Sequence, residues 1–320
     1  MEPSVSRPST DNIATSPRPN RLRRWAMRLL RIVIIVYIVF SLLVAMSQEH
    51  LIFPGAYMSV PAGIARVPAN SESFRLDLAD GIQVSGLFLP ARATTSSAQR
   101  RPTIIYFYGN GSSLAGSATE LDLLRNCGAN VLSIDYPGYH PSTGKPSEAN
   151  CYAAAEALWD YAIKRPEVDP HQIIIVGWSI GGAVAIDLAH KHPSAPSPQG
   201  LMLISAFTSM DEMARLWMPL LPTGLLLRHH FTNITKIPDI HCPIIIAHGQ
   251  EDPMIPYAMS LRLRDAATGS SSVRQFPIPG AEHNDVFLIG AHQISGALTN
   301  LINTLPHPTT TTAPPESGDK

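Results

Sequence analysis

Short apolar runs and longer amphipathic stretches alternate along most of the chain. The short runs are rich in β-branched and aromatic residues, which is typical of buried strands. The Asp80-Gly81 turn between the first two runs predicts an antiparallel hairpin. The predicted strands are residues 73–78, 82–89, 103–108, 130–134, 173–176, 200–204, 243–247 and 273–278.

Stretches with apolar residues at helical spacing separate most of these strands. They predict helices at residues 114–127, 147–163, 182–190, 210–228, 257–266 and 285–305. Strands that alternate with helices favour a mostly parallel sheet with helices on both faces. We therefore predict one α/β domain over residues 51–305, built on an eight-stranded sheet. A single domain of this length is ordinary for this class.

The amino-terminal part of the chain joins a basic segment to an apolar run. Residues 1–24 are rich in Pro, Ser and Arg, which predicts a disordered tail. Residues 32–46 would span about 22 Å as a helix, so the helix must extend back to Trp25 to cross a hydrocarbon layer of about 30 Å. Arginine side chains in this extension can reach the lipid headgroups. We predict a transmembrane signal anchor over residues 25–47.

A cleaved signal peptide is the alternative for this segment, because Ala45-Met46-Ser47 resembles a cleavage site. The long arginine-rich lead favours the uncleaved anchor. In both cases the arginines before the apolar run predict a cytoplasmic amino terminus and a domain on the extracytoplasmic side, periplasmic or lumenal. Residues 306–320, rich in Thr and Pro, predict a second disordered tail.

Charge and cysteine content exclude several classes of function. The chain has 24 Lys and Arg against 25 Asp and Glu, so nothing indicates a nucleic-acid partner. Cys127, Cys151 and Cys242 match no zinc-binding pattern, and we predict neither a metal nor an organic cofactor. Buried thiols explain these residues, although an oxidising compartment would permit a Cys127–Cys151 disulfide. The sequence does not indicate an oligomeric state.

One pentapeptide is typical of nucleophilic catalysis. Gly177-Trp178-Ser179-Ile180-Gly181 lies between a predicted strand and a predicted helix of small residues. Such a sharp turn exposes a serine hydroxyl, and glycines let the backbone bend. The backbone N–H of Ile180 is then placed to donate to an oxyanion. An ordinary glycine turn is the alternative, but the strand and helix around the motif favour Ser179 as a nucleophile.

Two later strands end in residues that complete a triad with this serine. Asp252 follows strand 243–247, and His283 follows strand 273–278. Reactive groups gather at the carboxyl ends of parallel strands, and serine, acid, histidine is the chain order associated with this turn. We predict that His283 exchanges a proton with Ser179 and that Asp252 orients the imidazole.

Other residues compete for these roles. Glu251 and Asp285 are the alternative acids, and the turn ahead of Pro253 favours Asp252 over them. His248 is the alternative base, but it precedes a glycine turn and is better suited to support the acid loop. A second oxyanion donor is expected after strand 103–108, where the backbone N–H of Asn110 lies between two glycines.

A lid is expected over residues 207–241, between two strands. Its Met, Leu and Trp side chains recur at helical spacing, which is usual for core packing. Core packing is therefore the favoured interpretation, although a methionine-rich cover would also suit a flexible acyl chain. On that hypothesis Trp217 and Met218 are the candidate substrate-binding residues.

These motifs resemble the α/β-hydrolase fold. The likeness covers roughly residues 51–305 and rests on Y-G-N-G at 108–111, G-W-S-I-G-G at 177–182, H-G-Q-E-D-P-M-I-P at 248–256 and G-A-E-H-N-D at 280–285. With the anchor, the chain resembles single-pass, membrane-anchored α/β-hydrolase-domain proteins, whose relatives include protein depalmitoylases. The resemblance implies that Ser179 is the nucleophile, Asp252 the acid and His283 the base. Tyr108, where the family usually has histidine, and His140-Pro141, where it has a small residue, are departures.

The sequence thus predicts a membrane-anchored serine hydrolase that cleaves carboxylic esters or thioesters, with a lipid-like acyl substrate as one hypothesis. The same triad also serves peptidases and amidases, which remain an alternative. A fold of this kind without turnover, as an anchored scaffold protein, is a second alternative.

Overall fold

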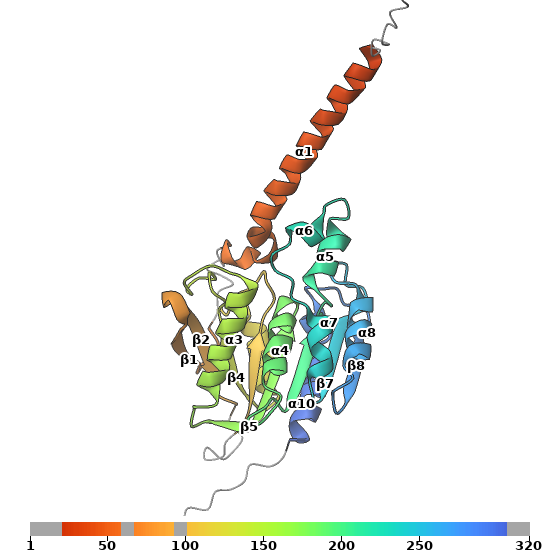
Figure 1. The fold of residues 1–320 in the computed structure, drawn as a ribbon. Coiled ribbons are helices and arrows are strands. Elements are labelled where there is room, and N and C mark those ends of the chain that lie inside the picture. Colours follow the sequence, from red (N-terminus) through yellow and green to blue (C-terminus); the bar gives the residue numbers. More distant parts are fainter. Residues whose placement is uncertain (1–20, 59–66, 93–100, 306–320) are drawn as a thin grey trace, which may run out of the picture. The chain divides into compact units, whose positions relative to one another are not determined.

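The computed structural model describes residues 21–58, 67–92 and 101–305, and the chain divides into two compact units, Met1–Met46 and Ser47–Lys320. The predicted carboxyl-terminal tail and residues 1–20 of the predicted amino-terminal tail lie outside the described residues. Helix α1 covers Arg21–Ile52, so it begins before the expected residue 25 (Figure 1). Arg and Leu are good helix formers, which accounts for the earlier start.

Helix α1 is long and apolar enough to cross a membrane, by length and composition. The helix continues through Ser47 to Ile52 because no proline or glycine interrupts it before Pro54. The described helix therefore includes the whole predicted anchor.

Within the described residues, eight strands form one sheet in the order β1-β2-β4-β3-β5-β6-β7-β8. The β1–β2 and β2–β4 pairs are antiparallel, and every pair from β4 to β8 is parallel. This confirms the predicted mostly parallel sheet and its opening hairpin. The strands are β1 (Glu72–Asp77), β2 (Gln83–Leu89), β3 (Arg101–Phe107), β4 (Asn130–Ile134), β5 (Val168–Trp178), β6 (Gly200–Ile204), β7 (Ile244–Gly249) and β8 (Val273–Ile278).

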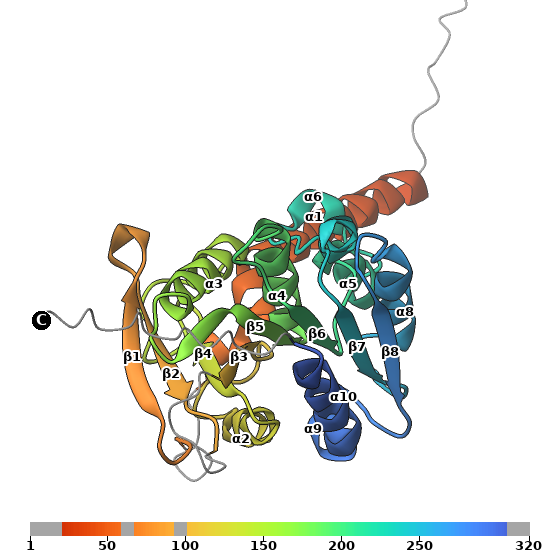
Figure 2. The ribbon, with the colours of Figure 1, turned by 90° about the horizontal axis from the view of Figure 1, so that it is seen from below.

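Helices cover both faces of this sheet. Figure 2 shows α3, α4 and α8 on one face and α2, α9 and α10 on the other. The helices are α2 (Ala118–Asn126), α3 (Glu148–Ala162), α4 (Ile180–Lys191), α5 (Met210–Trp217), α6 (Thr223–Leu226), α7 (Asn233–Lys236), α8 (Tyr257–Ala266), α9 (Val286–Ile289) and α10 (Ala291–Asn303). Because both faces are covered, the central strands are apolar on both sides, and Ile173, Ile174, Ile175 and Val176 of β5 are fully buried.

Three predicted helices differ from the observed ones. The predicted helix 210–228 ends at Trp217 and resumes only as the short α6, because prolines at 219 and 222 interrupt it. The predicted helix 285–305 is divided at Gly290, where a Cβ would lie 2.4 Å from the Ile278 side chain. The predicted helix 114–127 begins at Ala118, after a turn.

The three cysteines are free. Cys127 and Cys151 are buried, and Cys242 is half-buried. Burial raises the pKa of all three thiols, which makes them poor nucleophiles. The structure therefore contains no Cys127–Cys151 disulfide, and buried thiols account for these residues.

Candidate active site

Ser179 occupies a sharp turn between β5 and α4. Its backbone has φ 56° and ψ −121°, a region that non-glycine residues rarely adopt. The Ser179 N–H donates to the carbonyl of Ile204 at the end of β6, at 2.9 Å, and the Ser179 carbonyl accepts from the Gly182 N–H at 2.9 Å. These two bonds hold the strained turn in place.

Two glycines of the pentapeptide permit this turn. A Cβ on Gly177 would lie 2.3 Å from the carbonyl oxygen of Gly181, and a Cβ on Gly181 would lie 2.1 Å from the carbonyl oxygen of Phe107. Both clashes are with backbone atoms, which have little freedom to move. The strand β5, the helix α4 and the neighbouring end of β3 can therefore approach this closely only with glycine at both positions.

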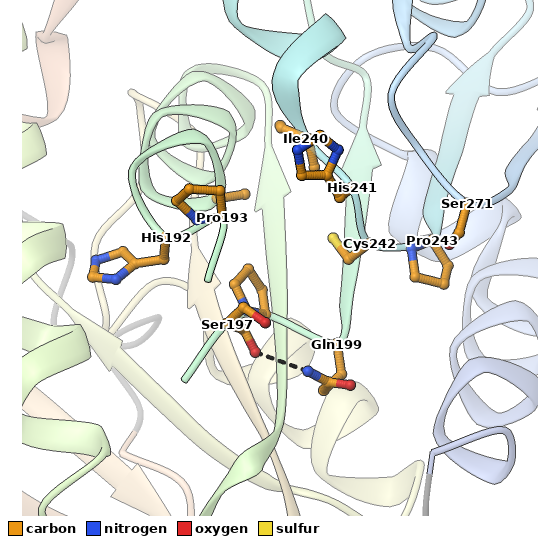
Figure 3. A pocket seen from close by; sticks show the side chains of 11 residues that line it. His192, Pro193, Ser197, Gln199, Ile240, His241, Cys242, Pro243 and Ser271 are labelled. Atoms are coloured by element: carbon orange, nitrogen blue, oxygen red, sulfur yellow. Dashed lines mark hydrogen bonds between the residues drawn. The ribbon is translucent and has the colours of Figure 1, made fainter. Parts of the chain in front are cut away.

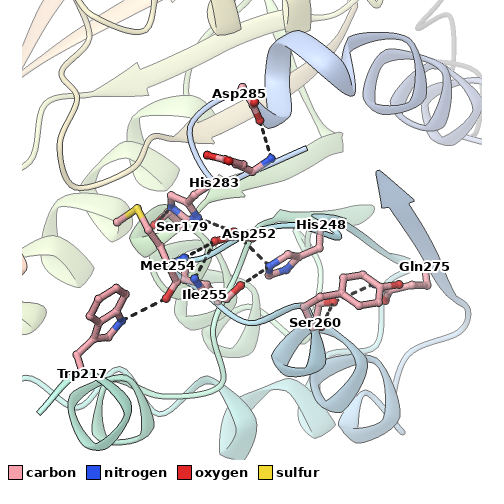
Figure 4. Close-up of polar contacts among 12 residues, drawn as sticks. Ser179, Trp217, His248, Asp252, Met254, Ile255, Ser260, Gln275, His283 and Asp285 are labelled. Atoms are coloured by element: carbon pink, nitrogen blue, oxygen red, sulfur yellow. Dashed lines mark hydrogen bonds and ion pairs between the residues drawn. The ribbon is translucent and has the colours of Figure 1, made fainter. Parts of the chain in front are cut away.

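His283 and Asp252 lie beside the serine in the order that the sequence predicts (Figure 4). The His283 Nε2 atom is 3.0 Å from Ser179 Oγ, and His283 Nδ1 is 2.7 Å from Asp252 Oδ2. All three side chains are at most 7% exposed. Each comes from a connection that follows a parallel strand, β5, β7 or β8, so the carboxyl edge of the sheet brings them together.

Backbone and side-chain groups fix the Asp252 carboxylate. Its Oδ1 atom accepts from the N–H groups of Met254 at 2.9 Å and Ile255 at 2.8 Å. Burial alone would raise the pKa of Asp252, but the interactions with His248, His283 and the Ile255 N–H hold that pKa well below its ordinary value. The carboxylate is therefore charged at neutral pH and can stabilise an imidazolium at His283.

The competing residues have other surroundings. His248 is fully buried, its Nε2 atom lies 2.9 Å from the Ile255 carbonyl and 3.4 Å from Asp252 Oδ2, and it thus supports the acid loop as expected. Glu251 is exposed. Asp285 accepts the N–H of Glu282 at 2.7 Å, which stabilises the turn that follows β8.

The loop that carries Asn110 passes next to the serine. A Cβ on Gly109 would lie 3.5 Å from the Cβ of Ser179, so the backbone here is close to the hydroxyl. The Asn110 carbonyl accepts from the Gly55 N–H at 3.0 Å and from the Tyr139 hydroxyl at 2.8 Å, and the Asn110 amide donates to the Ile52 carbonyl at 2.8 Å. The loop is therefore held on both its backbone and its side chain.

Two backbone N–H groups near Ser179 are free to donate. Ile180 is the first residue of α4, so its N–H has no acceptor within the helix. Across the described parts of the chain, the Asn110 N–H has no acceptor either. These are the two donors that the sequence predicts for an oxyanion.

Tyr108 directly precedes the Asn110 loop and helps to hold it through a buried hydrogen bond. Its hydroxyl donates to Asp135 Oδ1 at 2.7 Å, and the Leu114 N–H donates to the same oxygen at 2.8 Å. Burial raises the pKa of Asp135 to about 6, against these two hydrogen bonds, which lower it. Tyr108, which follows β3, is thus connected to Asp135, and Asp135 in turn holds Leu114 at the end of the Asn110 loop.

The two candidate substrate-binding residues lie at the end of α5. The Trp217 indole N–H donates to the carbonyl of Met254 at 3.2 Å, so this side chain contacts the acid loop (Figure 4). Met218 is half-buried, and its N–H donates to the Ala214 carbonyl at 2.8 Å. The structure therefore brings Trp217, but not Met218, into hydrogen-bonding contact with the loop of the triad.

A separate cavity lies at the opposite edge of the sheet. It has a volume of about 290 Å³ and lies beside the amino ends of β6 and β7, where His192, Ser197, Gln199 and Cys242 line it (Figure 3). None of the triad residues lines it. In residues 21–58, 67–92 and 101–305 no cluster of three His, Cys, Asp or Glu side chains is suited to hold a metal ion.

Comparison with known proteins identifies the family. A family model described as the alpha/beta hydrolase fold matches residues 102–227. The uncharacterized protein Rv2307c of Mycobacterium tuberculosis is 30% identical over 278 residues, which cover 86% of this chain and 95% of that protein. The chain belongs to the α/β-hydrolase family.

Other relatives carry the family name. Alpha/beta hydrolase domain-containing protein 17B of Homo sapiens is 35% identical to this α/β hydrolase over 191 residues, which cover 59% of the chain and 63% of that protein. Alpha/beta hydrolase domain-containing protein WAV2 of Arabidopsis thaliana is 28% identical over 269 residues, with 78% and 85% covered. This α/β hydrolase is therefore similar to both proteins over more than half of its length.

Solved structures share the fold. The Pyrococcus furiosus esterase Pf2001 matches with a TM-score of 0.59 at 17% identity, over 74% of this chain and 97% of that one. The Pyrococcus horikoshii acylaminoacyl peptidase matches with a TM-score of 0.60 at 14% identity, over 76% and 43%. At these identities the likeness concerns the fold alone. Family and fold together support a hydrolase.

Sequence reasoning missed the residues that support the site. Ile52 and Gly55 hold the Asn110 loop although they precede it by more than fifty positions, and no local pattern indicates such a contact. Met254 links Trp217 to the acid loop through its carbonyl alone, which any residue type provides. Asp135 directly follows the predicted strand 130–134, and a carboxylate at the carboxyl end of a buried strand is a usable signal for a residue near the site.

Proposed function

We propose that this α/β hydrolase is a serine hydrolase that cleaves carboxylic esters or thioesters through an acyl-enzyme. The single observation that carries the proposal is the continuous contact from Ser179 Oγ to His283 at 3.0 Å and from His283 to Asp252 at 2.7 Å. A serine hydroxyl is a weak nucleophile until a base accepts its proton. An imidazole oriented by a charged, buried carboxylate supplies such a base.

The reaction follows from these positions. His283 accepts the proton as Ser179 Oγ attacks the acyl carbon, and the carbonyl oxygen becomes an oxyanion. The N–H groups of Ile180 and Asn110 stabilise this charge. His283 then returns the proton to the alcohol or thiol leaving group as its bond to the acyl carbon breaks. Water, deprotonated by His283, attacks the acyl-enzyme. The acid is released when the Ser179 ester bond breaks and His283 returns the proton to Ser179 Oγ.

The proposed substrate is lipid-like and the proposed site of action is a membrane surface. The apolar helix α1 supports single-pass anchoring, and the arginines before it favour a cytoplasmic amino terminus with the hydrolase on the extracytoplasmic side. A lid rich in Leu and Met is suited to a flexible acyl chain. The sequence resemblance to a branch with protein depalmitoylases supports an acyl thioester or ester, with Trp217 and Met218 lining the acyl site.

Labelling by a fluorophosphonate probe tests the mechanism. The purified full chain should react with the probe, and Ser179→Ala should abolish labelling. Ser197→Ala, in the separate cavity at the other edge of the sheet, is the matched control and should label normally. A native protein that resists the probe would favour the scaffold alternative and contradict the proposal.

A substrate panel tests the reaction class. Esters and thioesters should be hydrolysed faster than the amides with the same acyl chain. Among the esters and thioesters, those with longer acyl chains should be hydrolysed faster. Equal or faster cleavage of the amides would assign the protein to the peptidases and amidases instead. Both assays use the anchored protein in detergent micelles.

A further inference from the structure

The lid has an exposed apolar tip. We use lid tip for Leu216, Trp217, Leu220 and Leu225, which are 50%, 57%, 84% and 84% exposed. Residues 216–227 contain no charged side chain, and Arg215 and Arg228 bound them. Prolines and a glycine in this stretch prevent one long helix that could turn its apolar face inward.

Exposure of this kind is costly in water. Single exposed leucines are normal on soluble proteins, but several large apolar side chains in one short segment mark an interaction site. Uncharged apolar segments with a tryptophan and flanking arginines are typical of segments that lie in a membrane interface. The chemistry of the lid tip therefore fits a lipid surface.

The residues that directly follow the lid tip are hydrogen-bonded to the part of the chain that follows the apolar run 32–46. The Gln48 side chain accepts the Arg228 N–H at 2.8 Å and donates to the Leu226 carbonyl at 3.2 Å. The Arg228 guanidinium is also 3.8 Å from the Glu49 carboxylate. Gln48 follows the apolar run 32–46 by only two positions, so chain connectivity keeps residues 226 and 228 close to the carboxyl end of that run.

Further apolar side chains are exposed just after Gln48. Leu51 is 52% exposed and Met58 is 62% exposed. They belong to the same short segment whose Ile52 and Gly55 contact the Asn110 loop. Exposed apolar groups thus come from two segments that meet through the Gln48 side chain, which extends the surface beyond the lid itself.

We propose that the lid tip inserts into the interface of the bilayer that anchors the protein. The inference rests on the proposed membrane anchoring and gives the lid a second, peripheral contact with lipid. Leu220 and Leu225 enter the acyl region, and the exposed part of the Trp217 ring lies at headgroup level while its N–H keeps the hydrogen bond to the Met254 carbonyl. An acyl chain could then pass from the lipid to the lid without crossing water.

Depth-dependent quenching tests this contact. Leu225→Cys, in a Cys242→Ser background, is labelled with the polarity-sensitive dye NBD in proteoliposomes that hold the full chain. Lys164→Cys is the control, because Lys164 is exposed between α3 and β5, at the amino edge of the sheet. We expect blue-shifted NBD emission at position 225 that a doxyl-labelled phosphatidylcholine quenches strongly, and water-like, unquenched emission at position 164.

Two results would overturn the proposal. The first is emission at position 225 that matches position 164 in wavelength and in quenching. The second is blue-shifted emission that the doxyl lipid leaves unchanged, since it would mean that a second copy of the chain covers the lid tip. Neither readout requires turnover, and both can be repeated with Ser179→Ala, so a failure here is distinct from a failure of the proposed hydrolase function.

An activity split gives a second measurement. Leu220→Glu with Leu225→Glu should leave the hydrolysis of a short water-soluble ester unchanged and should reduce several-fold the hydrolysis of a long-chain ester presented in the same proteoliposomes. Leu220→Ala with Leu225→Ala is the matched control for side-chain removal without charge. Its rate on the long-chain ester should lie between the rates of the native protein and the double Glu variant. Equal rates for the native and the Glu variants on the bilayer substrate would contradict the insertion.

Discussion

The Tyr108 hydroxyl donates a 2.7 Å hydrogen bond to the Asp135 carboxylate, in a position where both side chains are buried. The same carboxylate accepts the Leu114 N–H, so Tyr108 at the end of β3 is connected through Asp135 to the residue that follows the Asn110 loop. Burial raises the pKa of Asp135 to about 6, so folding penalises the charged form of this carboxyl group. This relationship makes the stability of the domain depend on pH.

Asp135→Asn should therefore stabilise the protein at neutral pH. An acid with a raised pKa in the folded state contributes full stability below its unfolded pKa, about 4, and loses it as pH rises through about 6. Asparagine is neutral and accepts the same two bonds. We expect the free energy of unfolding to increase by about 3 kcal/mol at pH 7.5 and by less than about 1 kcal/mol at pH 4.

Urea unfolding monitored by tryptophan fluorescence measures this difference. Asp265→Asn is a surface control, and its effect should stay within about 0.5 kcal/mol at both pH values. If the variant is only as stable as the native protein at pH 7.5, the charged form of Asp135 does not destabilise the folded state.

Asp252→Asn should reduce kcat by about 10⁴-fold while the fold is retained. The amide would orient His283 in the wrong tautomer and could not stabilise the imidazolium. Hydrolysis of a short phenyl ester provides the measurement. Glu251→Gln and Asp285→Asn test the two rival acids and should leave kcat nearly unchanged, and a comparable loss in either variant would reassign the acid.

Gly181→Ala should destabilise the domain by about 3 kcal/mol or more, because the new methyl group would lie 2.1 Å from the Phe107 carbonyl oxygen. Gly111→Ala is the control in the neighbouring loop, where no atom lies within 4 Å of the added Cβ. Thermal unfolding of both variants makes the comparison. Equal melting temperatures would show that the turn tolerates a wider separation of β5, α4 and β3 than the geometry indicates.

Alanine at both Trp217 and Met218 should raise KM for long-chain esters by about tenfold, the equivalent of roughly 1.4 kcal/mol of lost apolar contact. KM for acetyl esters, which cannot reach the end of α5, is the internal control and should change much less. Steady-state kinetics on a chain-length series gives both values. An equal increase for both substrates would argue that the two residues serve lid packing rather than acyl binding.

Much of the fold follows from local pattern. The eight strands are predictable because each is a short apolar run bounded by turn residues, and β4, β6 and β8 agree with the expected residues at both ends. The proximity of Ser179, Asp252 and His283 is predictable because the loops that follow parallel strands lie at one edge of the sheet. Helix limits near proline and glycine were less predictable, since the divided helix at Gly290 depends on contact with Ile278 in a distant strand.

The supports of the site depend on tertiary contacts that no local pattern encodes. The Gln48 side chain bonds to residues 226 and 228. A glutamine in the sequence does not reveal whether its amide contacts solvent or a distant segment. Met254 acts through its backbone N–H and its backbone carbonyl. Such contacts cannot be predicted from the sequence, because the residue that offers a main-chain N–H or carbonyl can be of almost any type.

Ile52 and Gly55 limit where the hydrolase can be trimmed for secretion or crystallisation. A chain shortened to start at residue 59 would keep every strand of the sheet together with Ser179, Asp252 and His283. It would lack the carbonyl and the N–H that clasp Asn110 from either side. Removal of the residues before Gln48 alone would retain Ile52 and Gly55 and thus both of these hydrogen bonds to Asn110.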